Sequence, residues 1–503
     1  MKIPLLTISI FSAAAAAVTC SKHVDIFPRN RARGVNPDTN LVIKFTTPPT
    51  VGTSGMIYVY DAADWSVVDS LNMSIPASPN PSGRAAASDG STTAPRPDLN
   101  DTNAYQVNII GGVDFHFNPI IVRDNTATIY LHNNKLQYGR SYVVKMDPEV
   151  LEVAEGFKGF KDRSWTFKTK AHAPRRSKSR VVVASDGSGD FNTVQGALDW
   201  APATPDKPIT IFIKNGHYEE LVYAQNKSKL VIRGQSRNRT TVGYPNNSAF
   251  NPSGRPGPSR RPAFSLQNVT DIQLSDFTIK NYFIGQAEAL LVRGERVIVD
   301  HMTLNGSGDA FTTYGTIYFV DSLLTGDGDT VLGYAAIFWH RSEIQSIGPV
   351  TWTRTPEGSH GNVFLDSRII GLDKPLPWSV TESNPDGQKV PATFARLPRN
   401  NGGSAVNFPY AEMVLLNTKT SLIDPSGWGA IEPEPSFNWT NVRFWEYNTM
   451  DLQGNKVDMS MRHPISKELL WPLDSETIEN YSKPEFVLNG WKPRVVREKR
   501  GAE

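Results

Sequence analysis

The sequence has almost no cysteine: Cys20 is the only one among 503 residues. An intramolecular disulfide needs two cysteines, so any folded domain here depends on its hydrophobic core and its hydrogen bonds. The chain also lacks an excess of charge of either sign, with 52 Lys and Arg against 50 Asp and Glu and a formal net charge of +2. It shows no basic stripe of the kind that binds nucleic acid, and we expect no nucleic-acid partner.

Long apolar runs are missing except near the N-terminus. There Lys2 is followed by IPLLTISIFS and then by the small residues AAAAAV. This run is too short to span a bilayer, and its order of a basic residue, an apolar run and small residues is typical of a secretory signal peptide. We predict a signal peptide over residues 1–19, a secreted, extracellular protein and no membrane partner. Asn-x-Ser/Thr sequons such as those at Asn226 and Asn268 agree with a glycoprotein.

Residues 24–172 contain short runs of alternating apolar and polar residues, among them NLVIKF, GMIYVYDA and SYVVKM. Such runs at fairly even spacing predict a β-sandwich. A stretch rich in Ser, Pro, Ala and Gly predicts a long loop near residues 76–104. The segments FTTPP and WTFKTK resemble parts of the Ig-like modules that accompany secreted bacterial enzymes. We therefore expect an Ig-like sandwich, followed by a basic linker over residues 173–180.

The spacing and grouping of the apolar runs change after Arg180. Short β-branched strands such as ITIFIK and KLVIRG recur in groups a little over twenty residues long, with no long helices between them. This pattern predicts a parallel β-helix over residues 181–490, in which each coil stacks on the previous one. A propeller or a second sandwich is the alternative. Unequal repeats, and an amphipathic helix around Val194 and Leu198 that is placed to cap the first coil, favour the solenoid. Residues 491–503 are expected to form a basic, solvated tail.

Three polar residues recur at the spacing of these coils: Gln286, Asp309 and Asp329 are 23 and then 20 residues apart. If they occupy equivalent positions, their strands lie about 4.7–4.9 Å apart on one face. Two carboxylates so close cannot both ionise easily, so the pKa of one rises. A neutral acid beside an ionised carboxylate is the arrangement that acid–base and nucleophilic catalysis require.

Each of these residues also has a purely structural interpretation. Asp309 follows a glycine and suits a turn, and so does Asp327. Gln286 suits the edge of a strand. Asp329 is different, because Thr-Val-Leu follows it directly and no turn residue separates it from a strand. Since the three occur together at the spacing of a coil, we favour a catalytic interpretation.

Four stretches between residue 181 and about residue 450 resemble the pectin methylesterase (pectinesterase) family of carbohydrate esterases. DGSGDFNTVQGAL with IFIKNGHYEE is similar to the opening strand, helix and second strand of that family. GQAEALLV resembles its HQAVAL segment, and GDAFTTYGTIYFVDSLLTGDGDTVLGYAA resembles its block from QDTLY to GTVDFIFGNA. SLIDPSGW resembles the segment that ends in a substrate-stacking Trp. The resemblance implies a right-handed parallel β-helix, so the chain is expected to be all-β.

The resemblance also implies roles for the polar residues. Asp329 would attack the methyl ester carbonyl of a galacturonate unit, and Asp309 would protonate the departing methanol and then activate water. Gln286 would donate to the oxyanion. No metal, cofactor or serine nucleophile is implied, and the sequence contains neither a Gly-x-Ser-x-Gly elbow nor a His-Glu-x-x-His motif. The implied partner is pectin, an acidic plant cell-wall polysaccharide, and we expect a monomer.

The family also uses an arginine that orients its nucleophile and a tryptophan that stacks on substrate. Trp428 stands at the place of the tryptophan. Arg396 is the expected catalytic arginine, because strand alternation puts it on the same face as Phe394. Arg399 is the other candidate and is expected to bind substrate.

The chain departs from the family's pattern at three places. The Gln before the acid/base residue is Gly308 here, the aromatic residue after the nucleophile is Thr330, and TFARLPRNNGG lacks the Trp of the family's LGRPW segment. These departures leave open an esterase that acts on a different uronate ester, and a catalytically impaired β-helix that binds polysaccharide. A glycosidase using the same carboxylates is a further alternative. The product distinguishes them: methanol from an esterase, new reducing ends from a glycosidase.

Overall fold

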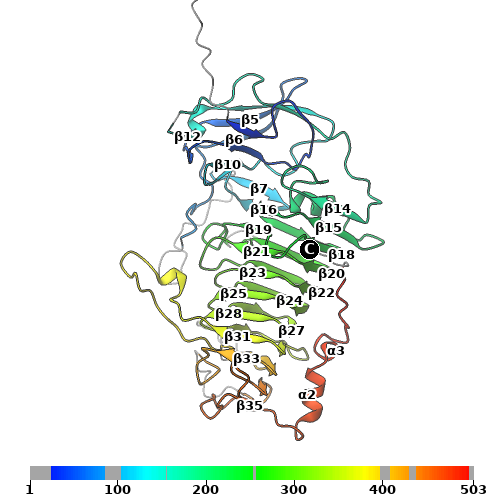
Figure 1. Cartoon of the computed structure of the whole chain (residues 1–503), viewed down its shortest axis with the longest axis vertical. Coiled ribbons are helices and arrows are strands. Elements are labelled where there is room, and N and C mark those ends of the chain that lie inside the picture. The colour runs from blue at the N-terminus through cyan, green and yellow to red at the C-terminus, as the bar shows by residue number, and fades with distance from the viewer. Residues whose placement is uncertain are drawn as a thin grey trace, which may run out of the picture.

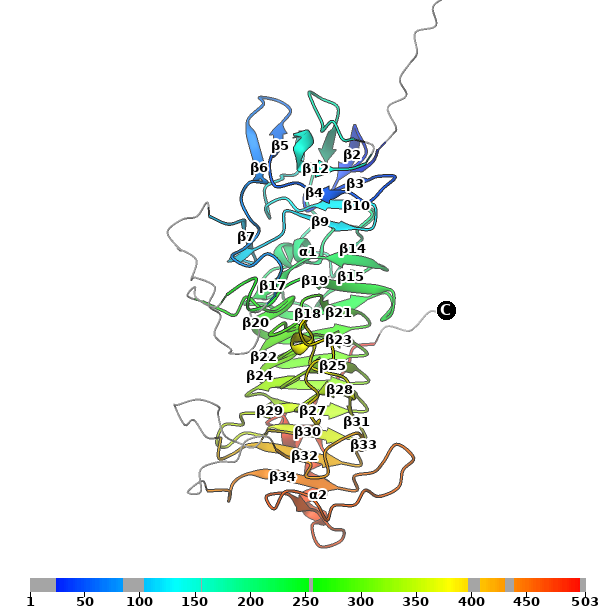
Figure 2. The same cartoon turned by 90° about the vertical axis from the view of Figure 1, so that its left-hand side faces the viewer.

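The structure is a computed structural model that describes residues 24–84, 104–154, 156–252, 257–396, 408–429 and 438–497. In this part of the chain, a small two-sheet unit stands at one end of a long stack of parallel strands (Figures 1 and 2). The predicted signal peptide, Cys20, most of the loop predicted near 76–104, and Arg399 lie outside the described residues. No helix within the described ranges has the length and apolarity to cross a bilayer.

The N-terminal unit is a β-sandwich. One sheet has the strand order β1-β3-β10-β9 and the other has the order β2-β13-β11-β5-β6. Side chains from both sheets, such as Ile43 and Val59, form one buried core that also contains Trp165. This arrangement agrees with the sandwich that the sequence predicts, whereas the Ig-like assignment stays a prediction.

The sandwich strands are short, as alternating runs between turns require. They are β1 (Asp25–Phe27), β2 (Ala32–Val35), β3 (Leu41–Lys44), β5 (Met56–Asp61), β6 (Val67–Asn72), β9 (Ile120–Arg123), β10 (Thr126–Ile129), β11 (Ser141–Met146) and β13 (Thr166–Thr169). Two small pairs accompany them: β4 (Thr50–Val51) with β12 (Leu151–Glu152), and β7 (Val107–Ile110) with β8 (Val113–His116). A 3-10 turn, η1, covers Pro148–Val150.

From residue 180 onward the chain forms a parallel β-helix, as predicted. One long sheet has the order β14-β15-β18-β20-β22-β24-β27-β30-β32-β34-β35, with β17, β26 and β29 beside it, and a second has the order β16-β19-β21-β23-β25-β28-β31-β33. The pairings in both sheets are parallel, so each strand lies on its counterpart in the preceding coil. A propeller or a second sandwich is therefore excluded, because those folds are antiparallel.

The strand bounds of the long sheet are β14 (Arg180–Val183), β15 (Ile209–Ile213), β17 (Val222–Gln225), β18 (Ser228–Gly234), β20 (Phe264–Ser275), β22 (Leu290–Asp300), β24 (Phe311–Val320), β26 (Val331–Gly333), β27 (Ala336–His340), β29 (Thr351–Thr353), β30 (Asn362–Leu365), β32 (Glu412–Leu416), β34 (Arg443–Tyr447) and β35 (Lys467–Glu468). Those of the second sheet are β16 (Gly216–Glu219), β19 (Thr240–Tyr244), β21 (Thr278–Asn281), β23 (Thr303–Asn305), β25 (Leu323–Asp327), β28 (Glu343–Ile347), β31 (Arg368–Gly371) and β33 (Lys419–Ser421). The helical elements are α1 (Val194–Trp200), η2 (Pro377–Ser379), α2 (Ser475–Tyr481) and α3 (Pro484–Val487).

The interior of the β-helix consists of apolar columns, with one side chain from each coil. Because paired strands keep their register, each inward residue lies on the equivalent residue of the coil before it. One such column is Ile211, Ile232, Leu274, Val299, Phe319, Trp339, Phe364 and Leu415. All eight are fully buried, and the rings of Trp339 and Phe364 stack with centroids 5.2 Å apart. This stacking fixes the register in which the coils carry their outward side chains.

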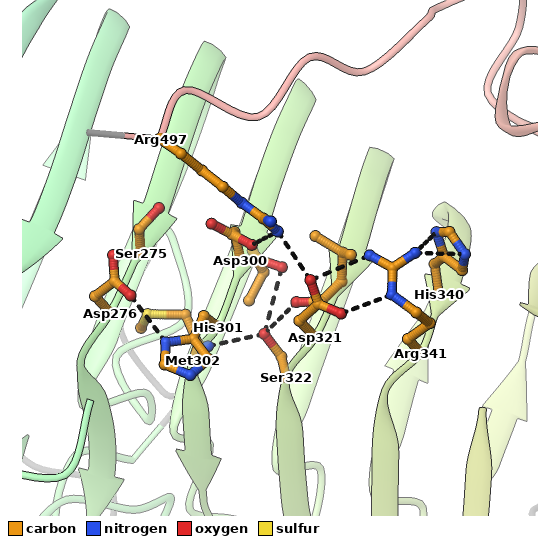
Figure 3. A network of polar contacts seen from close by, with 12 residues as sticks. Ser275, Asp276, Asp300, His301, Met302, Asp321, Ser322, His340, Arg341 and Arg497 are labelled. Carbon is orange, nitrogen blue, oxygen red and sulfur yellow. Dashed lines mark hydrogen bonds and ion pairs between the residues drawn. The ribbon is translucent and has the colours of Figure 1, made fainter. Parts of the chain in front are cut away.

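The coils share a corner at which one residue adopts a left-handed backbone conformation. Asp276, His301, Asp321 and Arg341 have φ values of 60°, 51°, 50° and 45°. Asp and His tolerate this conformation better than most residues other than Gly. Their side chains pair between neighbouring coils: His301 Nδ1 lies 2.8 Å from an Asp276 oxygen, and Arg341 Nε donates to Asp321 at 2.9 Å (Figure 3). Acidic and basic groups therefore alternate along the corner.

The C-terminal segment crosses this corner. The Arg497 guanidinium donates to Asp300 at 3.0 Å and to Asp321 at 2.8 Å (Figure 3). The described part of the expected solvated tail, residues 491–497, is docked on this corner, although its basic side chains stay largely exposed. We call these residues the C-terminal strap. The Arg497 side chain thus pairs with carboxylates that belong to two neighbouring coils.

Helix α1 closes the first coil, where the sequence predicts it, and both parts of the molecule cap its N-terminus. Asp38 of the sandwich accepts hydrogen bonds from the N–H groups of Asn192 and Thr193, both at 2.8 Å. Glu220 of the β-helix accepts hydrogen bonds from the first two residues of α1, at 2.8 and 2.9 Å. Two carboxylates thus satisfy donors that have no partner within a helix. Asp38 also holds the sandwich against the first coil.

Replacing Asp38 by Ala is expected to lower the stability of the protein. The change removes the acceptor of the buried Asn192 N–H group and of the half-buried Thr193 N–H group. The unpaired buried group alone costs about 1–3 kcal/mol. Thermal unfolding followed by circular dichroism measures the effect as a lower Tm. As a control, Asp64→Ala removes a carboxylate that bonds Ser66 on an exposed turn, and we expect it to change the free energy of unfolding by no more than about 0.5 kcal/mol. Equal Tm values for the two variants would contradict the docking role of Asp38.

Candidate active site

Parallel pairing places three carboxylates in one column beside the first strands of successive coils in the long sheet. The first residues of β22, β24 and β26 are partners in the ladder. Two positions before these strands stand Glu288, Asp309 and Asp329, on coils about 4.7–4.9 Å apart. Asp309 and Asp329 share a left-handed backbone, with φ values of 57° and 50°. The structure therefore brings the two aspartates together, as their spacing predicts.

Gln286 does not belong to this column, contrary to the sequence-based expectation. It pairs with Gly308, the residue before Asp309. The residue aligned with Asp309 is Glu288, which the spacing argument missed. Leu290 pairs with residue 311, so this coil is 21 residues long, and a count of 21 back from Asp309 would have found Glu288. Gln286 still reaches the site, because its exposed side chain lines the same cleft.

A cleft of about 1110 Å³ opens over the aspartate pair. Its lining includes the four residues that the sequence predicts to be catalytic, which are Gln286, Asp309, Asp329 and Arg396. Four arginines in all face two acids there, so the cleft suits an anionic ligand. The described part of the chain contains no group of three or more His, Cys, Asp and Glu residues arranged to hold a metal ion.

Asp329 is held through one of its oxygens. Arg396 Nη1 donates to Oδ2 at 2.7 Å, and the side chains of Asp329 and Arg396 are only 18% and 11% exposed. Oδ1 has no hydrogen-bond partner among the described residues. Burial raises the pKa of Asp329, and the positive charges of Arg396 and Arg354 oppose this rise. An oriented carboxylate with one unpartnered oxygen in a desolvated site suits a nucleophile.

Asp309 lies between Asp329 and a second buried acid. Arg261 bridges this side of the column, with Nη1 3.4 Å from Asp309 Oδ2 and Nη2 2.5 Å from Glu288 Oε1. Burial raises the pKa of Asp309 to about 7. Arg261 opposes the rise, whereas the negative charges of Glu288 and Asp329 add to it. Asp309 can therefore keep a proton near neutral pH, as an acid catalyst must.

Glu288 is fully buried, and burial raises its pKa against the opposing charge of Arg261. Its Oε2 atom has no hydrogen-bond partner among the described residues. A buried carboxylate with an unpaired oxygen is costly. Groups of this kind gather at functional sites more often than elsewhere. We therefore add Glu288 and Arg261 to the residues that shape the site.

Two departures from the resemblance have a structural reason. A Cβ atom at Gly308 would lie 2.8 Å from the carbonyl oxygen of Gly285, so a glutamine cannot stand there unless the backbone moves. Thr330 is fully buried, and its hydroxyl lies 2.6 Å from that of Ser346. Its side chain therefore points into the β-helix, and the cleft has no aromatic ring at that position.

Trp428 lies in the core, which corrects the expectation that it stacks on substrate. It is 1% exposed, and its ring stacks on Phe444 with centroids 4.4 Å apart. A second ring, Phe394, lies 5.3 Å away. A side chain enclosed in this way cannot contact a ligand in the cleft.

Trp352 is the tryptophan that lines the cleft, and the sequence-based analysis did not identify it. The guanidinium carbons of Arg354 and Arg396 lie 3.8 and 4.1 Å from its ring centroid. A signal was present in the sequence, because the alternating stretch TWTR lies one coil after Asp329. Pairing of Leu332 with Trp352 confirms that register.

The glycine neighbours of Asp327 suggested a turn residue. The structure instead makes Asp327 the last residue of β25. It is buried, and the Ser307 hydroxyl lies 2.9 Å from both of its oxygens. Burial raises its pKa to about 7. Asp327 does not line the cleft, so it offers a matched comparison for the aspartates that do.

Part of the chain is similar to known proteins. Residues 180–361 match the pectinesterase family model. The chain is 25% identical over 293 residues to Pectinesterase 4 of Arabidopsis thaliana, covering 54% of this chain and 45% of that protein. It is 26% identical over 322 residues to a pectinesterase of Ralstonia nicotianae, covering 54% of this chain and 79% of that protein.

The extent of these matches varies. The chain spans 45% and 60% of the lengths of two Arabidopsis relatives, Pectinesterase 4 and probable pectinesterase 56. Among solved structures, the pectin methylesterase from carrot aligns with a TM-score of 0.49 and 21% identity, over 62% of this chain and 93% of that one. The pectin methylesterase from Erwinia chrysanthemi aligns with a TM-score of 0.49 and 22% identity, over 64% and 100%.

The two tryptophans are expected to respond differently to truncation. Trp428→Ala empties space in the core and should lower the free energy of unfolding by about 3–5 kcal/mol. Trp352→Ala removes a ring that is only partly buried at the cleft, so we expect a loss below about 2 kcal/mol. Denaturant unfolding of both variants beside the wild type measures the difference. Losses of equal size would contradict the placement of Trp428 in the core and Trp352 in the cleft.

Proposed function

We propose that this chain, whose residues 180–361 match the pectinesterase family model, is a secreted carboxylic ester hydrolase that demethylates pectin. One observation carries the proposal. Asp309 and Asp329 lie on neighbouring coils in one cleft, and Arg396 binds Asp329. Export is proposed from the N-terminal sequence, in which Lys2 precedes an apolar run and small residues.

In the first half-reaction, the Asp329 carboxylate attacks the carbonyl carbon of a methyl ester. The carbonyl oxygen takes up the negative charge as the new carbon–oxygen bond forms. When this intermediate collapses, the bond to the methoxy oxygen breaks and Asp309 gives its proton to that oxygen. Methanol leaves, and the sugar carbonyl stays bound to Asp329 as an anhydride. Arg396 keeps the attacking carboxylate ionised and oriented.

In the second half-reaction, the ionised Asp309 takes a proton from a water molecule. The resulting hydroxide attacks the carbonyl carbon of the anhydride, and the bond to the Asp329 oxygen breaks. Asp329 becomes an ionised carboxylate again, and Asp309 is again protonated. The polymer leaves with a free carboxyl group in place of the ester. Both aspartates have therefore returned to their starting states.

Gln286 is the donor that we assign to the oxyanion, because its amide is exposed at the cleft beside Gly308. Gly308 has no side chain to act as a second donor. Loss of one such donor typically costs about 10²–10³ in rate. We therefore expect this esterase to be slower than one that has both donors.

A binding module without turnover is the second candidate. It is favoured by the lack of a side-chain donor at Gly308, where a Cβ atom would clash with the backbone. Against it, Asp309 and Asp329 lie together in the cleft, and Glu288 stands one coil before Asp309 in the same column. Binding alone does not require acids whose burial and mutual repulsion raise their pKa values. An esterase acting on a different uronate ester fits the same geometry as the main proposal.

Wild-type protein is expected to release methanol from highly methylated pectin. Asp329→Ala removes the nucleophile and should lower the rate by at least about 10³-fold. Asp309→Asn removes the proton donor and should lower it by about 10²–10⁴-fold. Methanol is measured by gas chromatography, and reducing ends are counted in the same samples.

Asp327→Asn is the matched control, because it changes a buried carboxyl group near Asp329 that does not line the cleft. We expect it to keep the wild-type rate. New reducing ends without methanol would replace the esterase by a glycosidase. Pectin binding by the wild type with no product at any pH would favour the binding module.

The rate is expected to fall on both sides of an optimum pH, because Asp329 must be ionised and Asp309 protonated. A pKa of about 7 for Asp309 in the protein without substrate places the alkaline limb of the kcat/KM profile near neutrality. Glu288→Gln removes one of the negative charges that raise this pKa. Asp309 then loses its proton at lower pH, so the alkaline limb should move to lower pH. An unchanged limb would show that Glu288 does not act on Asp309.

A further inference from the structure

The outer face of one sandwich sheet carries aromatic rings that do not belong to the core. Tyr58 and Tyr60 alternate along β5 with the buried core residues Ile57 and Val59, so their side chains point away from the core. Trp65 stands in the loop between β5 and β6 and is 40% exposed. The ring centroids of Tyr58 and Tyr60 lie 5.6 Å apart, and those of Tyr60 and Trp65 lie 5.8 Å apart. The three rings form a continuous strip.

The backbone at Trp65 is left-handed, with a φ of 60°. Gly adopts this conformation without steric cost and Asn tolerates it, whereas a bulky side chain rarely adopts it. The Trp65 N–H donates to the Asp61 carbonyl at 2.9 Å, and the Asp61 N–H donates to the Ser66 carbonyl at 3.0 Å, so the loop is held in this form. Strained residues of this kind cluster at ligand sites. The loop thus presents an indole ring to solvent at a position that suits a smaller residue.

Two cations lie against these rings. Lys145 pairs with Tyr58 across the sheet, and its Nζ atom lies 5.5 Å from the Tyr60 centroid and 4.8 Å from the Trp65 centroid. The Arg163 guanidinium carbon lies 5.0 Å from the Trp65 centroid. Within the described ranges, neither cation forms an ion pair with a carboxylate. We call Tyr58, Tyr60, Trp65, Lys145 and Arg163 the aromatic–cationic face.

Carboxylates in the adjoining turns already have partners. Asp61 lies 3.7 Å from the Arg140 guanidinium, and Asp64 accepts a hydrogen bond from the Ser66 N–H at 2.9 Å. Asp147 accepts a hydrogen bond from the first N–H of β5 at 2.9 Å. The positive charges of Lys145 and Arg163 therefore stay available to an external anion.

A second pair of cations extends the positive charge over the same side of the sheet. Lys168 of β13 is the ladder partner of Arg33 of β2, and both side chains are exposed. Phe167, the neighbour of Lys168, points into the core instead. Like charges directly opposite each other destabilise a sheet, and neither Lys168 nor Arg33 has a carboxylate partner among the described residues. A bound polyanion would remove this repulsion.

We propose that the aromatic–cationic face is a second binding site, which takes an acidic polysaccharide of the polyuronate class. The C–H faces of sugar rings are apolar and pack on aromatic rings, while the ammonium and guanidinium groups bind the carboxylates. A neutral polysaccharide would leave both cations without a partner. The site lies at the sandwich end of the molecule (Figure 1), apart from the cleft, so it can bind polymer whether or not the cleft hydrolyses an ester.

Oxidative footprinting of the full-length protein tests the site locally. Hydroxyl radicals oxidise exposed tryptophans, and mass spectrometry measures the oxidation rate of each one. We expect de-esterified polygalacturonate to slow the oxidation of Trp65 several-fold. Trp471 is the internal control, because it is 57% exposed and follows the last strand, β35; its rate should not change. Equal rates for Trp65 with and without the polymer would overturn the proposal.

Binding to a polygalacturonate gel at low and high salt gives the second readout. Trp65→Asn removes the ring but keeps a residue that tolerates the left-handed backbone, so the fold is preserved. We expect Trp65→Asn and Arg163→Gln each to bind about 10-fold more weakly, and Arg163→Gln to lose part of the salt dependence. Trp471→Ala is the matched control and should bind like the wild type.

Methanol release separates this site from the esterase. Trp65→Asn should keep the wild-type kcat/KM on short methylated oligogalacturonates, which need only the cleft, and lose rate on insoluble pectin. Wild-type binding in both variants would overturn the second site and leave the esterase intact. Weaker binding in both, without methanol from any pectin, would uphold the site and overturn the esterase. An equal loss of binding to neutral cellulose would overturn the choice of an acidic ligand.

Discussion

The parallel pairing of successive coils is the constraint on which the rest of this molecule depends. Each coil repeats the backbone of the one before it at a strand spacing of about 4.7–4.9 Å, and buried columns such as that through Trp339 and Phe364 hold the register. A polar residue placed at one position of a coil therefore acquires neighbours from the adjoining coils. The column of Glu288, Asp309 and Asp329 is one result of this rule. The same rule explains how residues 20 or more positions apart form one cleft.

The same stacking creates an electrostatic problem that the arginines relieve. Glu288, Asp309 and Asp329 lie on consecutive coils, where burial and mutual repulsion disfavour three negative charges. Arg261 and Arg396 each bind into this column from a different segment. The outcome is an uneven distribution of charge, in which Asp329 has a close cation and Asp309 a more distant one. Two like residues can then hold different protonation states, which is how paired carboxylates divide the roles of acid and nucleophile.

Much of this arrangement could be predicted from the sequence, because solenoid contacts are local. Recurrent short strands predict the β-helix, and the 20-residue interval between Asp309 and Asp329 matches one coil. The interval of 23 residues misplaced Gln286, because coil length changes from one coil to the next and spacing alone does not give the register. Whether Trp428 is buried depends on which side of the chain faces the core. Only the packing of its ring on Phe444 decides this, and that contact cannot be read from the sequence. Docking of Arg497 depends on contacts between residues far apart, for which no local pattern exists.

The C-terminal strap has a consequence for the order in which the molecule is assembled. Neighbouring coils can form as soon as about two turns of the β-helix have been synthesised, since their contacts join residues some 20 positions apart. The strap instead joins Arg497 to Asp300, 197 residues earlier, and Val496 to Gln273, 223 residues earlier. These bonds cannot exist until residues 496 and 497 have left the ribosome. The strap therefore closes after the coils that it crosses have been synthesised, and completes a corner whose other contacts can already be in place.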